Sequence, residues 1–140
     1  MTRINLVPVE ELMDAHLFAE FREIKMVPKS LKRSLASRSV DQVLARIPSD
    51  FTLNRGHVTF FYNKGAYLAE RYEQIKAELE KRGVNFNRAS LFDPDKVFSN
   101  PVFNQQYSPT PEAYAIIRQR IAEKIAMKPN WYRKTQTSGQ

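Results

Sequence analysis

The clearest feature of the sequence is a helical spacing of apolar residues between positions 64 and 82. Apolar residues recur there every three or four positions, at Leu68, Tyr72, Ile75 and Leu79. This period is that of one face of an α-helix. Gly83 follows as a typical residue just past a helix C-terminus. The pattern therefore predicts a helix over residues 64–82.

Further helices are predicted from the same period and from end signals. The first begins near Pro8, because proline suits a first helical turn, and runs to about Ile24. The last spans Pro111–Met127 and stops before Pro129. Two shorter helices are expected between them, over Pro28–Ser37 and Asp41–Arg46.

The segment His57–Tyr62 has the β-branched and aromatic composition of a strand. No other segment offers it a convincing pairing partner, so we interpret it as a buried connection that leads into the helix at 64–82. Residues 84–108 are predicted to be irregular. The fold class is all-α, a single compact domain of about three main helices with long irregular connections. We expect this domain to span residues 1–134, with residues 135–140 as a disordered polar tail.

Composition narrows the chemistry. The chain of 140 residues suits one domain, and it has no cysteine, which excludes disulfides, cysteine zinc sites and thiol catalysis. No apolar run approaches the roughly 18–20 residues that cross a membrane. The first residues lack the charged start and apolar run of a signal peptide. We expect a soluble cytoplasmic protein.

The charge points to a polyanionic partner. The chain has 22 Lys and Arg against 15 Asp and Glu, with a pI of about 9.8. Residues 25–38 hold five basic side chains and no acidic one, and residues 118–134 hold six against one. Basic charge confined to two segments is typical of nucleic-acid binding. Two solvated helix faces are the alternative.

Three polar residues lie on the apolar side of the first predicted helix. At about 100° per residue, Glu20 lies near 40° and Glu23 near −20° from His16. Apolar residues share this sector, so a carboxylate here would have a raised pKa suited to proton transfer. One alternative is an internal salt-bridge cluster with arginines such as Arg3. The other is a metal site, although no recognisable metal motif is present.

The end of the chain combines cations with aromatic residues. On the last predicted helix, Arg120, Lys124 and Lys128 form a row that borders the apolar row of Ile117, Ile121 and Ile125. The only tryptophan, Trp131, follows with Tyr132. This combination suits phosphate contact and base stacking. Alternatively, Trp131 covers the core.

The start of the chain offers a nucleophile. Thr2 is small enough that Met1 is expected to be removed, which leaves Thr2 with a free α-amine. An α-amine titrates near 7.7–8.0 against about 10.4 for lysine, so its reactive fraction at neutral pH is on the order of a few hundred times larger. Such an amine can form a Schiff base.

Together these segments resemble the phage-type endonuclease V family, the pyrimidine-dimer DNA glycosylase and abasic-site lyase. The matching segments are collinear and are spread along the chain from end to end. They are residues 2–6 (TRINL), 14–17 (DAHL), 19–23 (AEFRE), 56–64 (GHVTFFYNK), 81–83 (KRG), 123–126 (EKIA) and 129–132 (PNWY).

The resemblance implies an all-α enzyme that kinks duplex DNA containing pyrimidine dimers or abasic sites and displaces the base opposite the lesion. Thr2 would attack C1′ of the 5′ sugar through its α-amine, and Glu23 would be the essential acid. Base loss would give an imine, and β-elimination would then cut the strand. The resemblance implies no cofactor and no metal, and a bacterial or viral protein associated with the nucleoid. We expect a monomer, since no heptad or edge strand suggests self-association.

The resemblance also assigns DNA-binding residues. Arg3, Arg22, Arg120 and Lys124 match positions that contact phosphate or order the site, and His16 matches a residue that lines it. Trp131 and Tyr132 match the aromatic C-terminus that recognises the lesion. Met26 replaces a family arginine, so one phosphate contact is expected to be lost or to pass to Lys25. Residues 27–50 match poorly.

Two other functions remain open. A non-catalytic protein that binds duplex DNA would explain the charge and Trp131 but would leave Glu23 without a purpose. A metal-dependent phosphodiesterase using His16, Glu20 and Glu23 would lose its activity in chelators, whereas the glycosylase would keep it.

Overall fold

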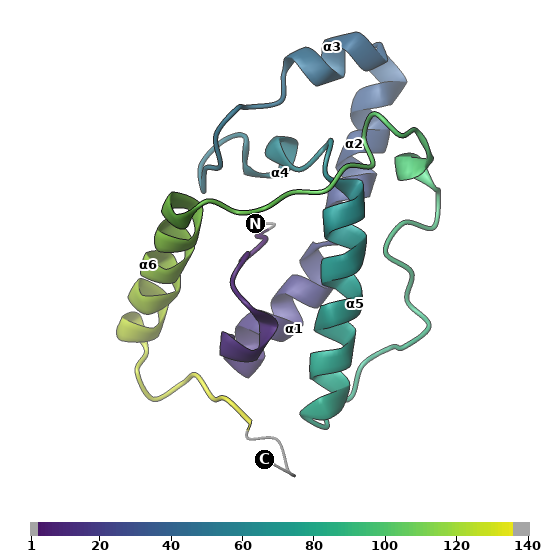
Figure 1. Ribbon diagram of the computed structural model, residues 1–140. Coiled ribbons are helices and arrows are strands. Elements are labelled where there is room, and N and C mark those ends of the chain that lie inside the picture. Colours follow the sequence, from purple (N-terminus) through teal and green to yellow (C-terminus); the bar gives the residue numbers. More distant parts are fainter. Residues whose placement is uncertain (1–2, 136–140) are drawn as a thin grey trace.

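The computed structural model describes residues 3–135, which form six α-helices and two 3-10 turns (Figure 1). The α-helices are α1 (Asp14–Glu23), α2 (Met26–Ser37), α3 (Val40–Ala45), α4 (His57–Phe60), α5 (Gly65–Lys81) and α6 (Pro111–Met127), and the 3-10 turns are η1 (Val9–Glu11) and η2 (Val97–Ser99). No β-strand forms within residues 3–135. The predicted all-α class is confirmed.

Helix α5 lies against α1 and forms one wall of the core. The apolar residues that predicted it are all buried: Leu68, Tyr72, Ile75 and Leu79. Gly83 has a φ of +73°, a left-handed conformation that favours glycine, and the helix ends just before it as predicted.

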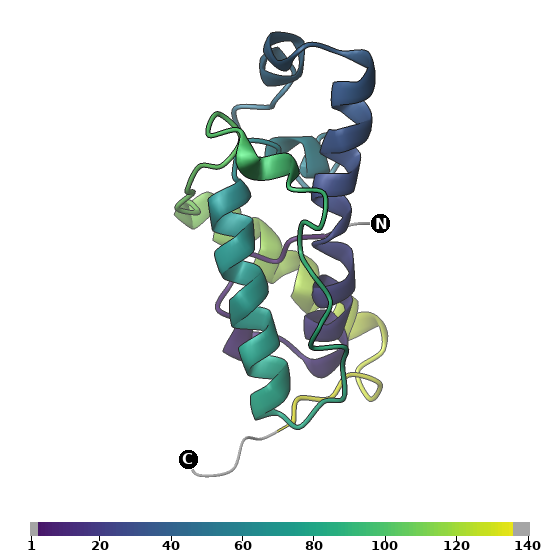
Figure 2. The ribbon, with the colours of Figure 1, turned by 90° about the vertical axis from the view of Figure 1, so that its right-hand side faces the viewer.

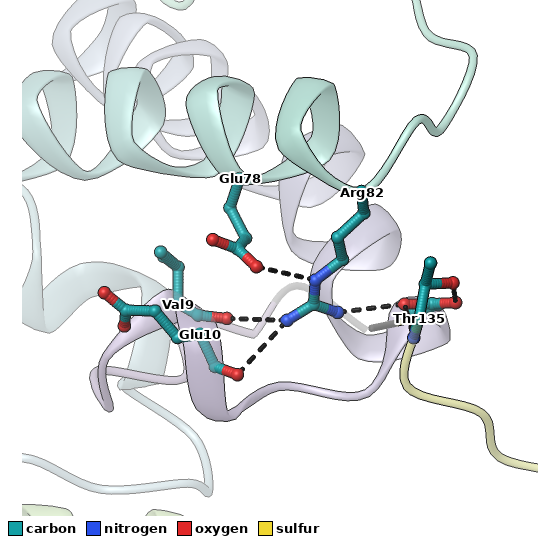
Figure 3. A network of polar contacts seen from close by, with 6 residues as sticks. Val9, Glu10, Glu78, Arg82 and Thr135 are labelled. Carbon is teal, nitrogen blue, oxygen red and sulfur yellow. Dashed lines mark hydrogen bonds and ion pairs between the residues drawn. The ribbon is translucent and has the colours of Figure 1, made fainter. Parts of the chain in front are cut away.

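The prediction of one continuous first helix is wrong at its start. The chain makes the 3-10 turn Val9–Glu11, is extended for two residues, and begins α1 only at Asp14. The buried side chain of Arg82 accounts for this break, because it donates hydrogen bonds to the carbonyls of Val9 and Glu10 (3.2 and 3.3 Å; Figure 3). In a continuous helix those carbonyls would accept N–H groups four residues later.

The segment with strand propensity is helical. His57–Phe60 forms α4, and residues 61–64 turn into α5. Phe61 is fully buried, with four other aromatic rings and the His57 ring at centroid distances of 5.2–6.3 Å. Side-chain burial therefore outweighs strand propensity, and the expected buried connection is confirmed.

Helix α6 has the predicted bounds and a well-formed start. The hydroxyl of Thr110 accepts the N–H of Ala113 (3.0 Å), and the helix ends before Pro129. Only its first half packs tightly, through Ala113 and Ile117, whereas Ile121 is half-buried. The segment that precedes α1 passes between α5 and α6 (Figures 1 and 2).

Residues 84–108 are irregular as predicted, apart from η2. They nevertheless supply four buried aromatic side chains to the core, Phe86, Phe92, Phe98 and Phe103. A Cβ at Gly65 would lie 2.5 Å from the ring of Phe98, so the start of α5 requires glycine. Across residues 3–135, no helix combines the length and the apolar character needed to cross a membrane.

Candidate active site

A pocket of about 360 Å³ lies between α1, α6 and the segment that precedes α1. Its walls are formed by Arg3, Asn5, His16, Ala19, Glu20, Glu23, Arg120, Ile121, Lys124 and Tyr132. Six of these residues were predicted as site residues: Arg3, His16, Glu23, Arg120, Lys124 and Tyr132. The two carboxylates come from α1, and two of the cations come from α6.

His57 holds the start of the described chain in place. Its Nε2 accepts the backbone N–H of Ile4 (2.9 Å), and its Nδ1 lies 2.8 Å from the carbonyl oxygen of Thr52. This pattern requires a neutral ring with the proton on Nδ1. Burial lowers the pKa of His57 to about 4, so the ring is neutral at pH 7. His57 therefore orients the chain that leads into the pocket.

Glu20 belongs to a buried ion pair with Arg71. The side chains are 0% and 4% exposed. Nε of Arg71 donates to Oε2 of Glu20, and Nη2 donates to Oε1 (3.1 Å). The backbone N–H of Asn5 also donates to Oε1 (3.1 Å). Both carboxylate oxygens are thus occupied, and the internal salt bridge that was the alternative for Glu20 is present, with Arg71 as the arginine.

Glu23 differs from Glu20 in its surroundings. It is half-buried on the pocket wall, less than one helical turn further along α1. Burial raises the pKa of its carboxyl above the usual range, although a backbone hydrogen bond from Arg3 and the charges of Arg22 and Arg3 act in the opposite direction. A solvent-accessible carboxyl with a raised pKa is suited to proton transfer near neutrality.

His16 and Tyr132 form another side of the pocket. Their rings stack with centroids 4.6 Å apart and an interplanar angle of 29°. Burial, and then the charge of Lys124, lower the pKa of His16, so this ring is neutral at pH 7. Its Nδ1 is buried and has no hydrogen-bond partner among residues 3–135.

Three positively charged side chains, Arg3, Arg120 and Lys124, line the pocket. Burial lowers the pKa of Arg3, and the nearby charge of Arg120 lowers it further, against the opposing effect of Glu23. The Arg3 guanidinium is held at one edge by a hydrogen bond to the carbonyl of Leu53 (3.0 Å). Like charges held this close favour an anion between them.

Three of the described residues that were predicted for the site are not part of the pocket wall. Arg22 and Lys25 line a separate hollow beside residues 90–94, where Nζ of Lys25 donates to the Ser90 hydroxyl (2.7 Å). Trp131 is 59% exposed and packs edge-on against Tyr132, with ring centroids 4.8 Å apart. Thr2 lies outside the described residues.

Sequence reasoning missed two residues of the site. Arg71 follows Leu68 by three positions and precedes Ile75 by four, which places it on the apolar face of α5. A charged residue on the apolar side of a predicted helix was the signal for Glu20 and Glu23, and the same signal is present for Arg71. Asn5 lies in an irregular segment, and no pattern points to it.

The metal alternative has no support in the geometry. The carboxylate of Glu20 is occupied by Arg71 and Asn5. Within residues 3–135, no group of three or more His, Asp or Glu side chains is arranged to hold a metal ion.

A half-buried carboxyl with a raised pKa beside several cations in one pocket suits an enzyme that acts on a polyanion. The sequence model described as pyrimidine dimer DNA glycosylase matches residues 1–91, about two-thirds of the chain, and the chain belongs to this family. It is therefore a DNA repair enzyme of the glycosylase class, with DNA as its substrate. The match includes Arg3, His16 and Glu23, and α6 follows it.

Proposed function

We propose that this enzyme removes the 5′ base of a cyclobutane pyrimidine dimer through a Schiff base on the α-amine of Thr2, and then cuts the strand by β-elimination. The observation that carries the proposal is the half-buried Glu23 carboxyl with a raised pKa, on a cationic pocket wall that includes Arg3. Thr2 is joined to Arg3 by one peptide bond, so its amine belongs to the same end of the chain.

The chemistry uses the amine as nucleophile and Glu23 as proton carrier. The amine nitrogen of Thr2 bonds to C1′ and the bond from C1′ to the base breaks, so that the proton lost by nitrogen balances the proton gained by the base. The sugar ring then opens to an imine, and Glu23 donates the proton that O4′ takes up. Its carboxylate next removes a proton from C2′, the C3′–O bond breaks and the phosphate leaves. Water hydrolyses the imine and restores the amine.

The arrangement of Glu23 supports this assignment over Glu20. A proton carrier must reach the substrate and exchange its proton with it. Both acids line the pocket, but Glu23 is half-buried, whereas Glu20 is buried and both of its oxygens are engaged by Arg71 and Asn5. We assign proton transfer to Glu23 and support of the pocket to Glu20.

Two groups of cations would bind the DNA backbone. Arg3, Arg120 and Lys124 surround the pocket and would contact the phosphates next to the lesion. Arg22 and Lys25 line the separate hollow and would contact phosphates further along the strand. Phosphate contacts of this kind position the duplex without selecting its sequence. His16, Tyr132 and Trp131 would contact the lesion itself.

Borohydride trapping tests the proposal, because borohydride reduces an imine to a stable amine. The full chain, with removal of Met1 verified by mass, is incubated in EDTA with borohydride and a duplex that contains one dimer. We expect a covalent adduct that maps to Thr2. Trapping on a lysine, or a correctly processed protein that binds the duplex without an adduct, would contradict the amine mechanism.

Substitution of Glu23 separates catalysis from binding. Glu23→Gln should bind the duplex with little change but cut it at least about 100-fold more slowly. Glu112→Gln is the matched control, since Glu112 is an exposed acid at the start of α6. Equal cutting by both variants would favour a different acid, and loss of wild-type cutting in EDTA would favour the metal-dependent alternative.

A further inference from the structure

Asp14, the first residue of α1, joins two distant parts of the chain. Nη1 of Arg82 donates to its Oδ1 (2.9 Å). From the C-terminal side, Thr135 donates its backbone N–H to Oδ1 (3.0 Å) and its hydroxyl to Oδ2. The backbone N–H of Asp14 itself donates to the carbonyl of Arg133 (2.7 Å). Asp14 therefore fastens residues 131–135, here called the C-terminal segment, to the start of α1.

Asp14 is supported by a buried and hydrogen-bonded arginine. Arg82 has a fully buried side chain whose Nε donates to Glu78 (2.7 Å), while the same guanidinium binds the carbonyls of Val9 and Glu10 (Figure 3). Burial by itself would raise the pKa of Asp14, but hydrogen bonds from Thr135 and Arg82 outweigh it and hold this pKa below the usual range. The carboxylate is thus charged at neutral pH and ready to accept the hydrogen bonds of the C-terminal segment.

The same segment carries the aromatic side of the pocket. Tyr132, three residues before Thr135, stacks on His16, two residues after Asp14. Trp131 packs against Tyr132 at the surface. The contacts of Asp14 and the stacked rings thus form one continuous interface between the C-terminal segment and the first turn of α1.

We propose that Asp14 is a positioning residue for lesion binding, which holds the C-terminal segment so that Tyr132 closes the pocket over His16. Asp14 itself is absent from the pocket wall and acts through Tyr132. The inference rests on the proposed function. Without Asp14 the segment would spend part of its time detached, and the apparent affinity would be the intrinsic affinity multiplied by the fraction of molecules in which Tyr132 is docked. Glu23 and the amine would be unchanged, so the rate on bound DNA would be kept.

The test compares Asp14→Ala with wild type in the full chain, using two readouts. The first is KM and kcat for cutting of a dimer-containing duplex. The second is acrylamide quenching of Trp131, the only tryptophan of the chain. We expect KM to rise about tenfold with kcat kept within about twofold. Quenching should increase while the far-UV circular dichroism spectrum stays unchanged.

Three further variants make the test specific. Asp50→Asn is the matched control, because Asp50 is an exposed aspartate with no side-chain partner among residues 3–135. Asp14→Asn retains one oxygen and should give intermediate values. Thr135→Val removes only the hydroxyl of an exposed residue, so it should shift KM and quenching in the same direction as Asp14→Ala but by less. If Asp14→Ala loses helix, the Thr135→Val result is the test of the positioning role.

The outcomes separate this inference from the proposed function. Unchanged KM and quenching in Asp14→Ala, or a lower kcat at constant KM, would overturn the positioning role. A role in helix stability alone would lower the melting temperature without changing the quenching of Trp131. A wild-type enzyme that does not cut would count against the proposed function, and quenching would still report whether Asp14 holds the segment.

Discussion

Replacing Arg71 by methionine is expected to destabilise the fold severely. The guanidinium of Arg71 makes four hydrogen bonds, two to Glu20 and two to the carbonyls of Leu6 and Val7. Methionine fills similar space but donates none of them. The carboxylate of Glu20, 0% exposed, would keep only the N–H of Asn5. The variant would therefore leave a buried charge without its counter-ion.

The expected magnitude follows from this burial. Removing one partner of a buried ion pair costs about 3–5 kcal/mol, because the remaining charge is neither solvated nor paired. A domain of this size has a total stability of about 5–15 kcal/mol. With a urea dependence of about 1–3 kcal/mol per molar, the midpoint of unfolding should fall by about 2 M.

Urea unfolding followed by far-UV circular dichroism at pH 7 measures this loss. Arg88→Met is the matched control, since Arg88 and its partner Glu80 are 56% and 65% exposed, and it should change stability by no more than about 0.5 kcal/mol. Adding Glu20→Met to Arg71→Met removes the stranded charge, so the double variant should lose at least about 2 kcal/mol less than the two single losses combined. A loss below about 1 kcal/mol for Arg71→Met would refute the buried ion pair.

Three further predictions follow from the site. Glu23→Gln should lose cutting but should not lose stability at pH 7. The folded pKa of Glu23 is raised, so the stability that Glu23 contributes is present below its unfolded pKa and is lost as pH rises through its folded pKa. A fall in melting temperature of the variant at pH 7 would contradict this prediction. For His57 the folded pKa of about 4 lies below the unfolded value of 6.5, so stability present above pH 6.5 should fall by roughly 3 kcal/mol as pH drops towards 4. Urea unfolding at pH 7.5 and 4.5 should show a smaller pH dependence in His57→Gln than in wild type, and equal dependences would disprove the assignment. Lys124→Ala should lower the slope of log affinity against log salt by about one for any duplex, with or without a lesion, measured by fluorescence anisotropy; an unchanged slope would mean that Lys124 contacts no phosphate.

Most helices of this protein could be predicted from the sequence, because their signals lie within their own residues. The apolar row of α5 and its stop at Gly83 are local, as are the cap at Thr110 and the proline after α6. The predicted start of the first helix was wrong because the signal for its interruption is not local. Its interruption depends on Arg82, which binds Val9 and Glu10 from more than seventy positions away.

The candidate site shows the same division. The helical period placed both Glu20 and Glu23 on the apolar side of their helix, but it could not tell them apart. The difference is Arg71, 51 positions from Glu20, which forms an ion pair with Glu20 but not with Glu23, although both acids line the pocket. Only packing decides such partners, because burial and pKa depend on residues that the fold brings from elsewhere.

The sequence by itself determined the all-α class, most helix boundaries, the distribution of charge and the resemblance to a family of DNA repair enzymes. Each of these depends on residue type and on local spacing. Only the tertiary structure decided that Arg3, Glu23 and Tyr132 share one pocket, and that Asp14 fastens the C-terminal segment beside it. Such contacts join distant parts of the chain, so their geometry exists only once the core has packed.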